Sequence, residues 1–146
     1  TFDSIEILGS RIFYGLAKEG ALKIKETSYI NTTAYPTGEF MHGHVAILNR
    51  KSAVVVLVDE INHGACIKNI KKIKESYNPF FVTVSDRNAP EYFYEICDNH
   101  LMIDTKDEVF AIFGTLVFLQ LTAFECAKLL HRNIDKPIGL SKVVKG

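Results

Sequence analysis

Residues 52–59, SAVVVLVD, narrow the possible folds of this chain more than any other stretch. β-branched valines fill half of its positions, and apolar residues run from 53 to 58 without the alternation of apolar and polar residues that marks a strand with one face in water. A strand buried on both faces is typical of the interior of a parallel sheet that helices cover on each side. The sequence therefore predicts an α/β fold.

Extended and helical patterns alternate along the rest of the chain. Further strands are predicted at 4–10, 80–85 and 100–104. Helices are predicted at 11–30, 61–77 and 108–131, and a turn at 35–38. This order predicts a three-layer sandwich in which helices flank a mostly parallel sheet.

The length of 146 residues fits one domain, residues 1–146, which includes a tail at 132–146. Ligands of such sheets bind beyond the carboxyl ends of the strands. We expect Gly9, Asp59 and Ser85 to lie at that edge.

Charge and hydropathy argue against several classes of partner. The chain has 17 Lys and Arg residues and 17 Asp and Glu residues, which gives no support for nucleic acid or an anionic membrane as the main partner. No signal-peptide pattern opens the sequence. The longest apolar stretch, 109–124, is interrupted by Gln120 and is short for a membrane span of about 20 residues. We interpret it as a core or interface helix.

The three cysteines, Cys66, Cys97 and Cys126, are far apart and form no CxxC pair. We therefore expect no disulfide framework, no cysteine metal site and a cytoplasmic location. The patterns of a P-loop, a GxGxxG dinucleotide site and a GxSxG hydrolase are absent from the sequence. We expect no cofactor.

A dense set of polar residues runs from position 19 to position 44. Glu19, Lys23 and Glu26 share one helix face, and spacing alone favours a surface ion-pair ladder worth a few tenths of a kcal/mol per pair. Gly20 costs roughly 1 kcal/mol inside a helix, which indicates close packing at that point.

His42 and His44 could share a metal only on a strand, and the sequence places no third ligand, so we assign no metal. Two other interpretations of the histidines stay open. One is an acid–base residue, and the other is a histidine hydrogen-bonded in a loop.

The segment LGSRIFYGLAKEGALKIKETSYINTTAYPTGEFMHGHVAIL, residues 8–48, resembles the sugar isomerase (SIS) domain. It is most similar to the second SIS half of the glutamine–fructose-6-phosphate amidotransferase (glucosamine-6-phosphate synthase) family, which shows LGRG, EGALKLKE and AYPAGELKHGPLAL. The tail NIDKPIGLSKVVKG is similar to the family's DxPRNLAKSVTVE. The resemblance covers about Ile7 to Val144 and implies a flavodoxin-like sheet.

The resemblance also implies catalytic roles. Glu26 would move a proton between C1 and C2 of a sugar phosphate, and His42 would help to open the sugar ring, reaching across a dimer. Lys142 would form a Schiff base with the open-chain ketose. Lys23 and Ser141 would contact the substrate.

Several positions depart from the family pattern. Met41-His42-Gly43-His44 replaces KHGP, and Ile138-Gly139 replaces an Arg-Asn pair in the tail. The ending LSKVV is also similar to the LxKVT of SIS deaminases and sugar-phosphate isomerases. An amino-sugar-phosphate deaminase or deglycase therefore stays open, as does a non-catalytic phosphosugar-binding dimerisation module.

Family enzymes carry two SIS halves, and the SxSGxT-type loop that binds the phosphate lies in the first. This chain has no such loop. The resemblance therefore implies the isomerase half of an enzyme that makes glucosamine 6-phosphate from fructose 6-phosphate, inactive by itself. The expected partners are a sugar phosphate, a first SIS half in the same or another chain, and a second copy in a homodimer.

Overall fold

The computed structural model describes residues 2–88 and 92–140 and contains a five-stranded sheet with the order β2-β1-β3-β4-β5. The strands are β1 (Ser4–Gly9), β2 (Asn31–Pro36), β3 (Ser52–Leu57), β4 (Phe80–Ser85) and β5 (Asn99–Met102). All neighbouring strands are parallel, and Val55 of β3 lies between Ile7 and Val82. The α/β fold and the parallel sheet predicted from the sequence are therefore confirmed.

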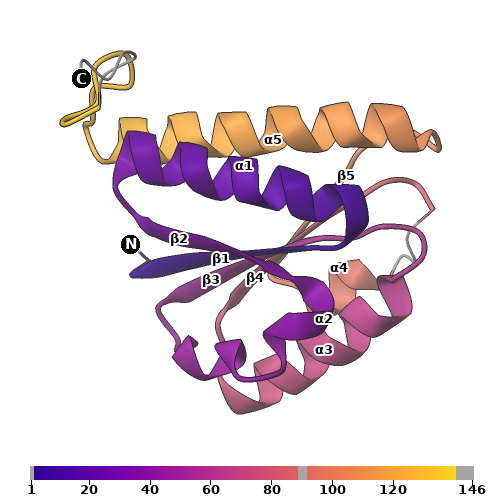
Figure 1. Ribbon diagram of the computed structural model, residues 1–146. Coiled ribbons are helices and arrows are strands. Elements are labelled where there is room, and N and C mark those ends of the chain that lie inside the picture. The colour runs from indigo at the N-terminus through magenta and orange to yellow at the C-terminus, as the bar shows by residue number, and fades with distance from the viewer. Residues whose placement is uncertain (1, 89–91, 141–146) are drawn as a thin grey trace.

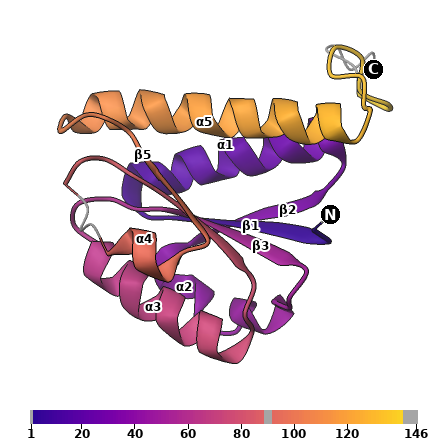
Figure 2. The same cartoon turned by 180° about the vertical axis from the view of Figure 1, so that it is seen from behind.

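Helices cover both faces of this sheet, which completes the three layers (Figure 1). One face carries α1 (Arg11–Ser28) and α5 (Glu108–Leu129). The other carries α2 (Thr37–Phe40), the 3-10 helix η1 (His44–Ile47), α3 (His63–Ser76) and α4 (Phe93–Ile96). Figure 2 shows the same layers from behind, with α1 and α5 again side by side.

Strand β3 explains why the chain has two cores. Its six residues are all buried, and successive side chains point to opposite faces. Val55 and Leu57 pack beneath α1 and α5, whereas Val54 and Val56 pack against the α3 layer. The interpretation of 52–59 as a strand buried on both faces is confirmed.

Strand β2 is the strand that the sequence did not predict, and the short helices α2, η1 and α4 were not predicted either. Residues 31–36 were interpreted as part of a polar loop and turn, yet they pair with β1 from end to end. As the outer strand, β2 has one hydrogen-bonded neighbour, so polar residues are tolerated and Pro36 can close it without breaking a ladder. A short edge strand of this composition has almost no periodic signal.

Helices α1 and α5 meet at a glycine. A Cβ atom on Gly20 would lie 2.8 Å from Cδ2 of Leu119, so only glycine lets the two helices approach this closely. The expectation that packing accounts for Gly20 is confirmed. Thr27 adds a polar link, because its hydroxyl donates to the carbonyl of Ala123 on α5 at 3.2 Å.

Helix α5 buries mainly small residues, with Leu119 as the exception, and exposes large ones. Its buried positions are Ala111, Thr115, Leu119, Ala123 and Ala127, at four-residue spacing. Its exposed apolar side chains are Val109, Phe110, Phe113, Val117, Leu121, Phe124 and Leu129. At 22 residues, α5 is long and apolar enough to cross a membrane by length and composition alone, although one side of it packs on α1.

Candidate functional site

The ion-pair ladder expected on α1 is present. The ammonium of Lys23 lies 3.1 Å from Oε2 of Glu26 and 3.8 Å from Oε1 of Glu19. The hydrogen bond with Glu26 is the main reason why the pKa of Lys23 is raised above its ordinary value. Both partners are partly exposed, with 31% of the Glu26 side chain and 41% of the Lys23 side chain accessible, so the pair adds little stability.

A hollow of about 660 Å³ opens beside this pair. One wall is the last part of α1, with Lys23, Glu26 and Thr27. The opposite wall is the tail that follows α5, with Ile134, Asp135, Lys136, Pro137 and Leu140. Its volume is in the range of small-molecule sites, and the ion-pair ladder and this hollow therefore lie on the same helix face.

His42 lies elsewhere. It is an exposed residue in the turn after α2, and its amide donates to the carbonyl of Glu39 at 2.9 Å. Helix α1 carries Glu26 away from the carboxyl ends of the strands, roughly 22 Å along its axis, whereas β2 returns the chain to that end before His42. Glu26 lies in α1 and His42 directly follows α2, and these two helices cover opposite faces of the sheet (Figure 1). One chain therefore does not bring Glu26 and His42 together.

His44 lies in a 3-10 helix, not in a strand, and packs against an aromatic ring. It begins η1, so the strand geometry in which it could share a metal with His42 is not formed. Its ring packs against Tyr35, with 4.5 Å between ring centres. In residues 2–88 and 92–140, no three His, Cys, Asp or Glu side chains gather as a metal site. Two other predicted site residues, Ser141 and Lys142, lie outside the described residues.

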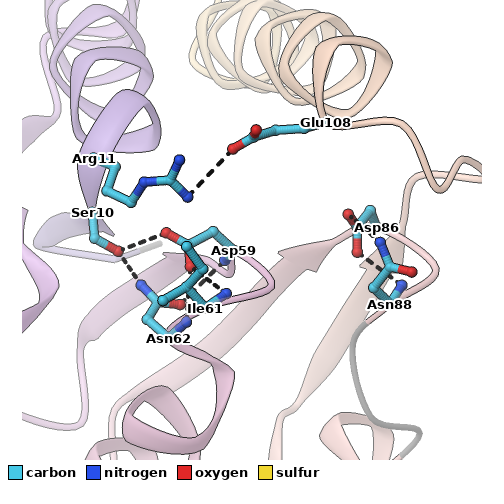
Figure 3. A network of polar contacts seen from close by, with 8 residues as sticks. All are labelled: Ser10, Arg11, Asp59, Ile61, Asn62, Asp86, Asn88 and Glu108. Carbon is cyan, nitrogen blue, oxygen red and sulfur yellow. Dashed lines mark hydrogen bonds and ion pairs between the residues drawn. The ribbon is translucent and has the colours of Figure 1, made fainter.

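A second candidate region lies at the carboxyl ends of β1 and β3, where the strand order changes direction and open α/β sheets bind ligands (Figure 3). Asp59, only 4% exposed, fills it. Its Oδ1 accepts hydrogen bonds from the amides of Ile61 (3.0 Å) and Asn62 (2.8 Å), and its Oδ2 accepts one from the hydroxyl of Ser10 (3.1 Å). The side-chain amide of Asn62 also bonds to the Ser10 hydroxyl.

The Asp59 carboxylate thus accepts hydrogen bonds from the two backbone amides that directly precede α3, at the edge of the sheet where ligands of such folds bind. Sequence reasoning placed Asp59 at this edge but missed this role. The available signal was an aspartate directly after a buried strand and an asparagine three residues later, a pattern that forms such side-chain turns.

The rest of this crevice is small and mainly acidic. Its volume is about 140 Å³, and Arg11 reaches across it to Glu108, with 3.4 Å between Nη1 and Oε1. The charged lining consists of Arg11, Lys106, Asp59, Glu60, Asp86 and Glu108. Four acids against two bases disfavour a phosphate group here.

Arg11 has φ +52°, a left-handed conformation that favours glycine, at the position where the LGRG pattern has its second glycine. The chain therefore holds a cation in a strained backbone position at this crevice.

Comparisons with known proteins agree with this fold. The SIS domain family model matches residues 3–127. A glutamine–fructose-6-phosphate aminotransferase (isomerizing) of Methanosarcina acetivorans is 34% identical over 138 residues, which cover 94% of this chain and 22% of that protein. The chain therefore spans about a fifth of the length of the curated relatives it matches.

Two solved structures extend the comparison. The C-terminal domain of the glucosamine-fructose-6-phosphate aminotransferase of Francisella tularensis has a TM-score of 0.77 and 25% identity, over 92% of this chain and 38% of that one. The glucosamine-6-phosphate deaminase of Thermotoga maritima has a TM-score of 0.76 and 24% identity, over 98% and 40%. The second similarity concerns the fold alone.

Proposed function

Because this chain belongs to the SIS domain family, we propose that it is the second SIS unit of an enzyme of the glutamine–fructose-6-phosphate aminotransferase type. The enzyme would convert fructose 6-phosphate and ammonia into glucosamine 6-phosphate and water. The observation that carries the proposal is the hollow in which Lys23 and Glu26 face the tail. Glu26, which the resemblance assigns to proton transfer, and Lys23, which it assigns to substrate contact, thus line a space large enough for a sugar.

The chemistry assigned to this hollow is a proton transfer. Glu26 would take a proton from C1 of the open-chain imine and return it to C2, which changes a ketose derivative into an aldose derivative. The charge-assisted hydrogen bond from Lys23 would hold the carboxylate in one orientation. Lys142 would form the Schiff base, and Ser141 would contact the sugar, by analogy with the family motif.

The proposal requires a second unit that binds the phosphate. In this chain Asp59 occupies the crevice where the strand order reverses, and its surroundings are acidic. Without binding energy from the phosphate, the sugar is poorly oriented and the reaction barrier stays high. The isolated chain is therefore proposed to be inactive, and a first SIS half would supply the phosphate site.

One apolar surface and the position of His42 support assembly with other units. The exposed face of α5 and the edge strand β5 line an apolar groove of about 660 Å³, which contains Leu101, Val117 and Leu121. Exposed apolar surface of this kind is typical of a subunit interface. His42 could act only in a neighbouring copy's site, because it lies far from Glu26 in its own chain. We therefore propose a homodimer of two-unit enzymes, in the cytoplasm, where sugar phosphates and free thiols are usual.

The test is an isomerisation assay on this chain alone and with a separately produced SIS unit that carries a phosphate loop. We expect negligible turnover of fructose 6-phosphate by the chain alone and turnover by the pair. Micromolar binding of a hexose 6-phosphate to the chain alone, measured by calorimetry, would contradict the proposal, because it would require a phosphate site in this unit.

A second candidate is an amino-sugar-phosphate deaminase or deglycase that uses the same residues. The LSKVV tail and the fold shared with the Thermotoga maritima deaminase favour it. Analysis of the products formed from fructose 6-phosphate with ammonia and from glucosamine 6-phosphate would separate the two enzymes. A non-catalytic phosphosugar-binding module would bind in this assay and turn over neither compound.

A further inference from the structure

Tyr29, the first residue after α1, contacts the tail at two places. Its hydroxyl oxygen accepts a hydrogen bond from the amide of Ile138 at 2.6 Å, across 109 residues of sequence. The guanidinium carbon of Arg132 lies 5.1 Å from the centre of its ring, within the range of a cation–π contact. One side chain thus contacts the tail near its beginning and near its described end.

Little else attaches the tail to the domain. No residue from 131 to 140 is buried, and Ile138 is 80% exposed. Asn133 accepts hydrogen bonds from the amides of Asp135 and Lys136, which folds the tail on itself rather than onto the sheet layers. Among the described residues, the bond from Ile138 to Tyr29 is the hydrogen bond that joins 133–140 to the rest of the chain. Segments with so few contacts open easily.

The tail nevertheless forms one wall of the hollow beside Glu26. Tyr29 follows Glu26 by three residues, so the helix that carries the carboxylate also ends in the side chain that holds this wall. Figures 1 and 2 both show the tail next to the end of α1. Tyr29 itself has φ +62°, and its amide donates to the carbonyl of Lys25, which fixes its backbone at the helix end.

We propose that Tyr29 is a positioning residue for the sugar-phosphate site, because it holds the tail across the hollow that contains Lys23 and Glu26. This inference rests on the proposed function, since it assigns Tyr29 to the same site. The side chain does not touch the reacting carbons. It sets how close the tail wall stands to the helix that supplies the proton-transfer residue, and geometry of this kind strongly affects rate.

The test compares Tyr29→Phe with Tyr14→Phe on the same helix. Tyr29→Phe keeps the ring above which Arg132 lies and removes only the hydroxyl that accepts from Ile138. Amide hydrogen exchange at Ile138 should become roughly two- to tenfold faster, as expected for the loss of one hydrogen bond. Tyr14 lies near the start of α1 beside Lys18, so its variant should leave that exchange unchanged.

The second measurement is steady-state isomerisation by the chain assembled with its phosphate-binding unit. Tyr29→Phe should lower kcat several-fold and leave KM near the wild-type value, because the phosphate is held by the other unit. Unchanged exchange at Ile138 would refute the attachment of the tail by Tyr29. Faster exchange with an unchanged kcat would refute the positioning role. A wild-type assembly without isomerase activity would instead overturn the proposed function, and the exchange data would still test the attachment.

Discussion

Replacing two glycines of α1 tests how the helix that carries Glu26 is held. Gly15→Ala and Gly20→Ala make the same chemical change five residues apart. Alanine in place of glycine inside a helix stabilises it by up to about 1 kcal/mol. A Cβ at Gly15 meets nothing within 4 Å, so this variant should show the full gain.

Gly20→Ala should behave differently, because its new methyl group would lie 2.8 Å and 3.0 Å from the two Cδ atoms of Leu119. Comfortable carbon contacts are about 3.5–4.0 Å, so Leu119 or α5 must shift. Overpacking of this size costs about 1–3 kcal/mol. After the helix gain is subtracted, Gly20→Ala should lose up to about 2 kcal/mol. The two variants should therefore differ by about 1–3 kcal/mol in the free energy of unfolding.

Urea unfolding of the 146-residue chain, followed by circular dichroism, measures this difference at a constant m-value. The double variant Gly20→Ala with Leu119→Ala provides a check. Leu119→Ala alone removes buried atoms, and in the double variant the new methyl group fills part of that space, so the two losses should not add. Equal stabilisation by Gly15→Ala and Gly20→Ala would show that α5 does not pack on α1 in this way.

Three further predictions concern the site, a buried charge and assembly. Glu26→Gln should lower isomerisation by the assembled enzyme by about 10²–10⁴-fold, measured as proton exchange at C1, whereas Glu19→Gln, which removes the other partner of Lys23, should change it little. Glu6 is 1% exposed, and burial raises its pKa, so its contribution to stability is present below the pKa of the unfolded chain and is lost as pH rises through the folded pKa. Glu6→Gln should therefore gain stability over wild type as pH rises from 4 to 8 in urea titrations, and parallel pH profiles would contradict this. Phe113→Glu, on the exposed face of α5, should prevent association at tens of micromolar in light scattering, and an unchanged oligomer would move the interface elsewhere.

The sequence was sufficient to predict the helices and strands that have a strong hydrophobic pattern. The valine-rich run that became β3 and the buried isoleucines of α3 (Ile67, Ile70 and Ile73) allow few alternatives, because each must bury one or two whole faces. Strand β2 was missed because an edge strand needs only one bonded neighbour, so its composition is weakly constrained. Boundaries were also less certain than element types: β5 was predicted at 100–104 and lies at Asn99–Met102.

The candidate site was predictable only in part. The helical spacing of Lys23 and Glu26 places them on one face whatever surrounds them. The contact between Tyr29 and Ile138 joins positions 109 residues apart, and nothing local in either segment indicates it. The distance of His42 from Glu26 likewise depends on the direction of β2, an element that the sequence did not reveal. Contacts of this kind follow from topology rather than from composition.

The position of Asp59 limits how many sugar phosphates the assembled enzyme is expected to bind. If two SIS units of one enzyme share this architecture, each has a crevice where the strand order reverses. In this unit the crevice is occupied by a side chain that folding itself delivers, bonded to two amides and a hydroxyl. Because that carboxylate belongs to the chain, a substrate phosphate would have to break these three hydrogen bonds before it could bind in the second crevice. A titration of the assembled enzyme should therefore reach its end point at one sugar phosphate for every two SIS units.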